Sequence, residues 1–298
     1  MPEHPWQICS VTVTGPSHAQ MGEGCQDRCG IGTAGPVGEV LLLAIADGAG
    51  SAKYGAEGAA LVVETWLAHF TALFSEKKKE PTQEAPPVET EQHDSPAPLS
   101  DAGPAADADS QPDHESGPAA LSEEGFRLEA LEVLRHVREE AQRLAEARGC
   151  DAGEFNATLL GAVLLPGASF FGQVGDGCWV GSNGTCLGCL TWPTAGEFAS
   201  QTVFAGSRSA PEVLQCVVTG PEVRAIAGFT DGVERIALQL AQQLPEPGFF
   251  GPVFESVRQS GSALERELAA FLESERVCAE SDDDKTLLIL VRPDELLR

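Results

Sequence analysis

Hydrophobic positions along the chain form two long helical patterns among many shorter apolar runs. Apolar residues occupy most positions of Tyr54–Phe74, and in Phe126–Leu144 they recur every three or four residues. Both spacings match one buried face of an α-helix. Ser122 is placed to cap the second helix and Gly149 to end it. The pattern therefore predicts two helices that can pack as an antiparallel pair.

The rest of the chain reads mostly as strands. The predicted strands are Ile8–Thr14, Val40–Ala46, Asn156–Leu165, Ser169–Val174, Cys178–Gly181, Thr185–Leu190, Val213–Val218, Val223–Phe229 and Lys285–Val291. Two further helices are predicted at Val233–Leu244 and Ser262–Glu275. The run Val40–Ala46 is apolar at every position, which is typical of a strand buried on both faces. A β-sandwich with helices on both outer faces would bury such strands.

Residues 75–121 interrupt this pattern between the two long helices. The segment holds eight prolines, eleven acidic residues, three lysines and no aromatic residue. A stretch of this composition cannot bury enough apolar surface to offset the entropy of ordering it. We therefore predict a disordered, acidic, proline-rich insertion within a single domain that spans residues 1–298.

The net charge of the chain argues against nucleic acids and anionic membranes as partners. There are 45 acidic and 19 basic residues, a formal net charge of −26. Nucleic acids and anionic membrane surfaces require clustered lysine or arginine, so neither partner is expected. The longest apolar run, Val40–Ala46, is far shorter than the ~20 residues of a membrane helix. The first residues do not resemble a signal peptide, and the predicted location is cytoplasmic.

Nine cysteines leave a second kind of site to consider. Cys25 and Cys29 are four residues apart, and Cys186 and Cys189 form a C-x-x-C pair. A structural zinc site usually needs two such pairs or added histidines, and nothing in the sequence brings these pairs together. An odd number of cysteines also argues against a disulfide framework. Small, buried thiols in a reducing compartment are the favoured interpretation.

Aspartates stand at the ends of several apolar runs. Asp47, Asp176 and Asp231 each end such a run and are followed by glycine. The acidic triplet 282–284 directly precedes the last predicted strand, and Asp27 follows the first strand region. Asp-Gly is also the usual signature of a hairpin turn, and Asp176-Gly177 fits that alternative. A turn does not explain Asp231-Gly232, which leads into a helical pattern.

Carboxylates gathered at one edge of a sandwich would form a site made of oxygen ligands. Mg²⁺ and Mn²⁺ prefer such ligands. Two of these ions about 3.5–4 Å apart can activate a shared water for attack on phosphorus.

Six short motifs, in this order, resemble the protein phosphatase 2C family of metal-dependent serine/threonine phosphatases, in its compact bacterial form. They are Cys-Gln-Asp (25–27), Ile-Ala-Asp-Gly-Ala-Gly-Ser (45–51), Asn-Ala-Thr (156–158), Gln-Val-Gly-Asp-Gly (173–177), Phe-Thr-Asp-Gly-Val (229–233) and Asp-Asp-Lys-Thr (283–286). The resemblance implies an α+β fold, a central antiparallel β-sandwich flanked by helix pairs in α-β-β-α layers. It also implies a binuclear metal site at one end and a flap over residues 192–221.

The resemblance implies a role for each acid. Asp47 matches the residue that bridges two Mg²⁺ or Mn²⁺ ions, and the carbonyl of Gly48 matches a ligand of one of them. Asp231 and Asp283 match ligands of the other ion, so that Asp47, Asp231 and Asp283 form the catalytic set. Asp27 matches the acid near the first ion. Asp176 matches a residue that helps to hold a third, weaker ion.

One position departs from the family. Many members carry a phosphate-binding arginine five residues before the position of Asp27, where this chain has Gly22. His18, Arg28 and Arg208 are the candidates to replace it. The function implied is hydrolysis of phosphoserine or phosphothreonine in a protein substrate, such as a kinase or its target, by a metal-bridging hydroxide. The alternative is a phosphatase-like module that binds a phosphoprotein or regulator with little turnover.

Overall fold

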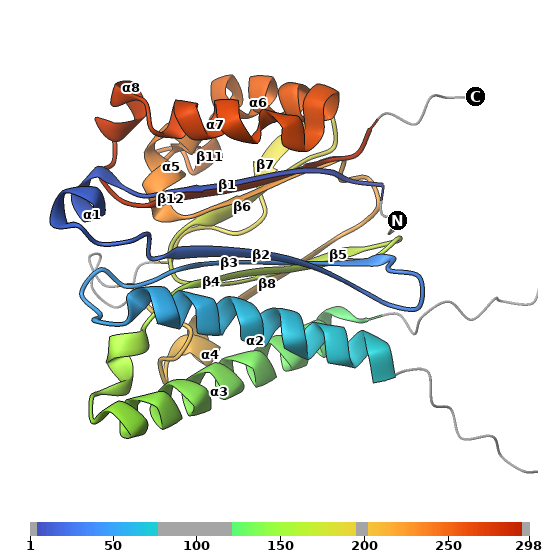
Figure 1. Ribbon diagram of the computed structural model, residues 1–298. Coiled ribbons are helices and arrows are strands. Elements are labelled where there is room, and N and C mark those ends of the chain that lie inside the picture. The colour runs from blue at the N-terminus through green and yellow to red at the C-terminus, as the bar shows by residue number, and fades with distance from the viewer. Residues whose placement is uncertain (1–4, 77–120, 195–201, 294–298) are drawn as a thin grey trace, which may run out of the picture.

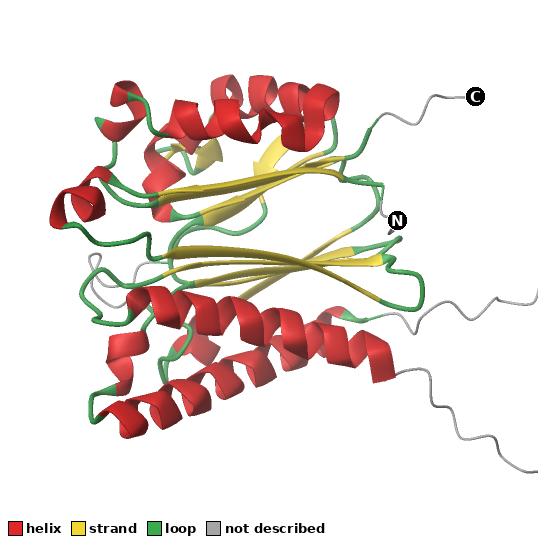
Figure 2. Ribbon diagram, viewed as in Figure 1, coloured by secondary structure: helices red, strands yellow, loops and turns green. Residues whose placement is uncertain are grey.

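Two antiparallel sheets lie face to face, and helices cover both outer faces (Figure 1; Figure 2). The structure is a computed structural model that describes residues 5–76, 121–194 and 202–293. One sheet has the strand order β1-β12-β9-β6-β7 and the other β2-β3-β4-β5-β8. The arrangement is the α-β-β-α sandwich that the resemblance implied.

The elements have the following bounds. The first sheet contains β1 (Gln7–Val13), β12 (Lys285–Val291), β9 (Ala225–Phe229), β6 (Cys178–Ser182) and β7 (Leu187–Cys189). The second contains β2 (Asp27–Ala34), β3 (Val40–Asp47), β4 (Leu159–Leu164), β5 (Ser169–Val174) and β8 (Gln215–Thr219). A small hairpin pairs β10 (Leu238–Gln239) with β11 (Leu244–Pro245). The helices are α1 (Pro16–Met21), α2 (Gly55–Glu76), α3 (Glu123–Arg148), α4 (Ala210–Val213), α5 (Asp231–Ala237), α6 (Pro247–Ser260), α7 (Glu265–Leu272) and α8 (Glu275–Cys278), with 3₁₀ turns η1 (Ala152–Phe155) and η2 (Gly261–Leu264).

Strand β3 shows why its sequence is apolar throughout. Leu41, Leu43 and Ile45 belong to the core between the two sheets, whereas Leu42 and Ala44 belong to the core beneath α2 and α3. Each of these side chains is at most 1% exposed. The predicted burial of this strand on both faces is confirmed.

Helices α2 and α3 pack as the predicted antiparallel pair (Figure 1). Arg148, at the end of α3, forms a two-pronged ion pair with Glu57, in the first turn of α2, at 2.8 and 2.6 Å. Ser122 caps α3 by accepting a hydrogen bond from the Gly125 N–H at 3.0 Å, and Gly149 ends it in the left-handed conformation. Both predicted helix signals are confirmed.

Helix α2 is long and apolar enough, by composition, to cross a membrane. In this fold its apolar side chains instead pack on the second sheet, where Trp66 and Phe70 are fully buried. The predicted insertion begins inside this helix, which runs to Glu76, and its residues 77–120 lie outside the described part of the chain. The extent of the insertion and the single-domain assignment stay predictions.

Several elements were not predicted, and β2, α1 and α6 are the three that matter most for the fold. Strand β2 contains two glycines and lies at the edge of its sheet, so alternation along it is weak. Helix α1 is only six residues long. Helix α6 begins at Pro247, where proline suits the first helical turn, and also contains Pro252 and two adjacent phenylalanines, a composition that reads as a loop.

The helix predicted at Val233–Leu244 is wrong beyond Ala237. Leu238 has the extended backbone φ −124°, ψ 139° and begins β10. The second half of the predicted helix therefore forms one strand of the small hairpin and the turn that follows it. Its apolar side chains belong to a strand and a turn, not to a continuous helical face.

The hairpin alternative for Asp176-Gly177 is also wrong. Strands β5 and β6 on either side of this pair belong to different sheets. Gly175 and Gly177 have φ of +99° and +83°, and they turn the chain from one sheet to the other. Asp176 therefore lies at the junction of the two sheets.

The packing of Trp66 on the second sheet gives a test of this core. A Cβ at Gly161, in the central strand β4, would overlap the Trp66 indole. We expect Gly161→Ala to lower the free energy of unfolding by about 1–3 kcal/mol, the usual cost of overpacking. Gly32→Ala is the control, because its Cβ would meet Leu67 at an ordinary 3.6 Å. Urea denaturation of both variants provides the measurement, and equal midpoints would contradict the packing described.

Candidate active site

Strand direction gathers five aspartates at one end of the sandwich. Asp27 begins β2 and Asp47 ends the antiparallel neighbour β3, so the two residues lie directly opposite each other. Asp176 follows β5, Asp231 follows β9, and Asp283 precedes β12. Because neighbouring strands run antiparallel, the ends of these strands meet at the same edge. The five acids named in the sequence analysis are thus brought together by topology alone.

Four of the five acids line a hollow of about 160 Å³. They are Asp47, Asp176, Asp231 and Asp283, and Gly48 also belongs to its wall. A carboxylate oxygen from each of Asp47, Asp176 and Asp231 lies within 4.8 Å of the other two. Among the described residues that line the hollow there is no lysine or arginine. The geometry is that of an oxygen-rich pocket for cations.

Asp27 is buried just behind the hollow. The Thr230 hydroxyl donates a hydrogen bond to Asp27 Oδ2 at 2.8 Å and accepts one from the Thr286 N–H at 2.9 Å. The second carboxylate oxygen, Oδ1, is buried without a hydrogen-bond partner, and so is Oδ1 of Asp231. A buried oxygen of this kind is costly unless something compensates it, and a cation would do so.

Threonines hold two of the other acids in place. The Asp47 N–H donates to Thr158 Oγ1 at 2.9 Å, and the Thr202 hydroxyl donates to Asp176 Oδ2 at 2.7 Å. Thr202 belongs to the segment predicted as the flap. Residues 195–201 of that segment lie outside the described part of the chain, and its end, Gln215–Thr219, forms strand β8.

The glycines after Asp47 and Asp231 are required by close packing. A Cβ at Gly48 would overlap the backbone of Gly55, and a Cβ at Gly232 would overlap the Asp284 carbonyl. Each Asp-Gly pair therefore places a carboxylate where two segments of backbone approach closely. This requirement accounts for the Asp-Gly repetition better than turn formation does.

Crowding of the acids opposes their ionisation. Burial, together with nearby Asp176 and Asp283, raises the pKa of Asp231 to about 8. Burial also raises the pKa of Asp27 to about 7, and burial with the charge of Asp27 raises the pKa of Asp47 well above its usual range. Glu234, which accepts the Gly177 N–H at 2.8 Å, has its pKa raised to about 7, mainly by burial. Bound cations would reverse these shifts.

Asp284 anchors the same edge although it does not line the hollow. It is 2% exposed and accepts hydrogen bonds from the Gly15 N–H and the Gln26 N–H, both at 2.6 Å. His18 Nδ1 lies 2.9 Å from Asp284 Oδ2, the oxygen that also accepts the Gln26 N–H. Burial opposes a charge on His18, but the hydrogen bond and charge of Asp284 outweigh it and raise the pKa of this imidazole. The pair leaves no signal in the sequence, because 266 residues separate its members.

The three candidates for phosphate binding do not reach the hollow. His18 is buried and bonded to Asp284, as described above. Arg28 is exposed on β2, next to Asp27 and therefore on the opposite face of the strand, and Arg208 is exposed in the turn before α4. None of them is among the residues that line the carboxylate hollow.

A cluster of aspartates between the ends of two sheets is a site suited to divalent cations and to metal-assisted hydrolysis of phosphate esters. Comparison with known proteins gives the family. The family model described as Protein phosphatase 2C matches residues 14–273. The chain belongs to the protein phosphatase 2C family and is a metal-dependent serine/threonine protein phosphatase.

Relatives cover nearly the whole chain. Serine/threonine-protein phosphatase 3 of Escherichia coli (strain K12) is 27% identical over 290 residues, which are 95% of this chain and 97% of the relative. The structure of serine/threonine phosphatase Stp1 from Staphylococcus aureus is similar with a TM-score of 0.54 and 14% identity, covering 98% of this chain and 95% of that one. The catalytic domain of the phosphatase PstP, in complex with two manganese ions, gives a TM-score of 0.55 and 11% identity, covering 97% and 99%. These two structures support the fold.

The raised pKa values predict how stability of the metal-free protein depends on pH. Asp27 and Asp231 keep their protons in the folded protein up to about pH 7 and 8, whereas unfolding restores ordinary values near 3.8. The folded state thus binds more protons, so its stability falls as pH rises from about 4 to about 8. We expect the urea midpoint of EDTA-treated protein to be lower at pH 8 than at pH 5.5. Asp231→Asn should flatten this dependence, and an unchanged slope would contradict the shifts.

The buried pair His18–Asp284 gives a second test. His18→Ala leaves a buried carboxylate without its side-chain partner, which typically costs about 3–5 kcal/mol. His18→Asn is the control, because an amide nitrogen can donate from nearly the position of Nδ1. We expect His18→Ala, and much less His18→Asn, to lower the urea midpoint in EDTA. Equal stability of His18→Ala and the wild type would mean that the two backbone N–H groups satisfy Asp284 unaided.

Proposed function

We propose that Asp47, the Gly48 carbonyl, Asp231 and Asp283 hold two Mg²⁺ or Mn²⁺ ions in the carboxylate hollow, and that Asp27 and Asp176 complete the site. Asp47 is placed centrally, since its charge interacts with those of Asp27, Asp231, Asp283 and Asp176. This central position supports a bridging role for Asp47. Asp176 lies on the side of Thr202 and suits a third, weaker ion.

The residues present fit divalent cations well. The donors that line the hollow are carboxylates, with backbone and hydroxyl oxygens beside them, and hard cations prefer such ligands. The unpartnered buried oxygens of Asp27 and Asp231 offer free lone pairs. Without cations, the mutual repulsion of these groups has no compensation from a lysine or arginine among the described lining residues.

When bound, such ions neutralise charge on a phosphoryl group and activate water for attack on phosphorus. The chain's own residues supply the positions. Thr202 and Thr230 bind the carboxylates of Asp176 and Asp27, and Thr158 holds the backbone of Asp47, so that these two carboxylates need little rearrangement when a substrate arrives. A pocket of this size takes a phosphoryl group and its nearest atoms, which leaves the rest of the substrate outside.

The substrate we propose is a phosphoserine or phosphothreonine residue of a protein, such as a kinase or a kinase target. The observation that supports catalysis is the convergence of Asp47, Asp176 and Asp231 within 4.8 Å of one another. The absence of a lysine or arginine among the described lining residues favours the alternative of a binding module with little turnover, and the complete set of carboxylates favours catalysis. Manganese-dependent hydrolysis of p-nitrophenyl phosphate by the purified chain is the direct test.

The bridging role of Asp47 predicts the effect of Asp47→Asn, which removes one negative charge while nearly preserving shape. Two cations repel each other strongly, and the shared carboxylate offsets that repulsion. We expect weaker binding of at least one ion in calorimetric titrations with Mn²⁺, and a fall in kcat of about two orders of magnitude. Asp231→Asn and Asp283→Asn should behave similarly but regain turnover at high Mn²⁺, because each serves one ion.

Asp282→Asn is the matched control for these variants. Asp282 is exposed, adjoins Asp283 in sequence and does not line the hollow. It should bind Mn²⁺ and turn over substrate as the wild type does. Near wild-type turnover of Asp47→Asn at ordinary Mn²⁺ concentrations would refute the two-ion assignment.

A further inference from the structure

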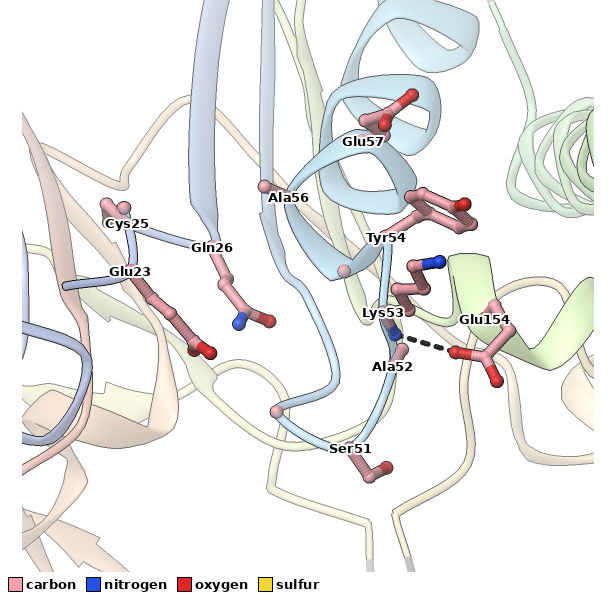
Figure 3. Close-up of a pocket in the computed structure, with 13 residues that line it drawn as sticks. Glu23, Cys25, Gln26, Ser51, Ala52, Lys53, Tyr54, Ala56, Glu57 and Glu154 are labelled. Carbon is pink, nitrogen blue, oxygen red and sulfur yellow. Dashed lines mark hydrogen bonds between the residues drawn. The ribbon is translucent and has the colours of Figure 1, made fainter. Parts of the chain in front are cut away.

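A second and larger hollow, of about 480 Å³, adjoins the carboxylate hollow. The two hollows share Gly50 and Ser51, so one opens beside the other. One wall of the larger hollow comes from the segment before β2, which carries Glu23 and Gln26 (Figure 3). The opposite wall comes from the loop between β3 and α2, which carries Lys53 and Tyr54. A substrate seated at the aspartates has this space available for its remaining atoms.

The loop that carries Lys53 is held firmly in place. The Lys53 N–H donates to Glu154 Oε2 at 2.7 Å (Figure 3). The Tyr54 N–H donates to the Glu154 carbonyl at 2.9 Å. The Tyr54 ring also stacks on Phe155, with 5.0 Å between ring centroids. Both residues that these bonds fix belong to the wall of the hollow, so the wall is preformed.

Two charged groups at this hollow lack an ionic partner among the described residues. Glu57 is neutralised by Arg148, and Glu154 is bonded to the Lys53 N–H. The Lys53 ammonium lies 5.2 Å from the centroid of the Tyr54 ring and forms no ion pair with any of the three glutamates that line the same hollow. The exposed Glu23 carboxylate likewise has no ion pair in the described part of the chain. The hollow thus presents a carboxylate and an ammonium on opposite walls, neither of them in an ion pair with a described residue.

We propose that the larger hollow receives the polypeptide next to the phosphorylated residue and reads the charge of its side chains. Glu23 would pair with a basic side chain of the substrate, and Lys53 with an acidic one. The inference rests on the proposed function, which seats the phosphoryl group in the carboxylate hollow. That hollow has room for the phosphoryl group but not for the chain that carries it. Opposite charges on opposite walls would also fix the direction in which the peptide lies.

Phosphothreonine peptides that differ only in flanking charge test the proposal. Glu23→Gln should lower kcat/KM about fivefold, through KM, for the peptide with basic flanks, and Lys53→Met should do so for the peptide with acidic flanks. Each variant should treat p-nitrophenyl phosphate as the wild type does, because this small ester carries no charged side chain that could pair with Glu23 or Lys53. Glu64→Gln and Arg28→Met, which change charges outside the hollow, are the matched controls.

Binding separates this proposal from the proposed function. Fluorescence anisotropy would follow the same peptides, made with a non-hydrolysable phosphonate, on the full chain with Mn²⁺. If the wild type distinguishes the peptides by their flanking charge and Glu23→Gln and Lys53→Met lose that preference, the role of the larger hollow is supported. This holds even if the wild type hydrolyses none of the substrates. Such a lack of hydrolysis would overturn the proposed function alone. Unchanged peptide preference and affinity in both variants would overturn the role of the hollow, whatever the turnover of p-nitrophenyl phosphate.

Discussion

Mutual repulsion among five carboxylates is the constraint around which this fold is arranged. Asp27, Asp47, Asp176, Asp231 and Asp283 are held together at one edge of the sandwich although burial and like charges raise the pKa of several of them. Such a cluster persists only because the surrounding structure over-determines it. The free energy that holds the carboxylates together comes from the packing of the strands and helices behind them, not from contacts within the site.

The layers provide this support directly. Strand β3 is buried on both faces and ends at Asp47. Strands β9 and β12 are buried throughout; Asp231 follows the end of β9, and Asp283 precedes the start of β12. Burial of apolar side chains contributes roughly 25 cal/mol per Å². A rigid, well-packed strand therefore fixes the position of the acid at its end. Asp284 adds a local anchor, since its bonds to Gly15 and Gln26 tie the first and last strands of the chain to the start of β2.

Much of this arrangement could be predicted from the sequence, because strands and acids share one signal. An apolar run that ends in Asp-Gly marks both a buried strand and the carboxylate at its end, as at Asp47 and Asp231. Elements whose residues carry no such alternation escaped prediction: β2 is rich in glycine, and α6 contains an internal proline. Contacts between distant residues, such as that of His18 with Asp284, depend on tertiary structure and leave no local pattern. The same holds for the opposed positions of Glu23 and Lys53, which face one hollow only because the segment after α1 lies across from the β3–α2 loop.

The crossing of the chain at Asp176 makes the carboxylate edge a joint between the two sheets. Asp27 and Asp47 belong to one sheet, and Asp231 and Asp283 adjoin strands of the other. A cation shared by these acids would bind both sheets, so that occupancy of the site and the spacing of the sheets would be thermodynamically linked. The contact of Phe171 with Trp179, whose ring centroids are 5.5 Å apart, is one of those that set the spacing of the two sheets.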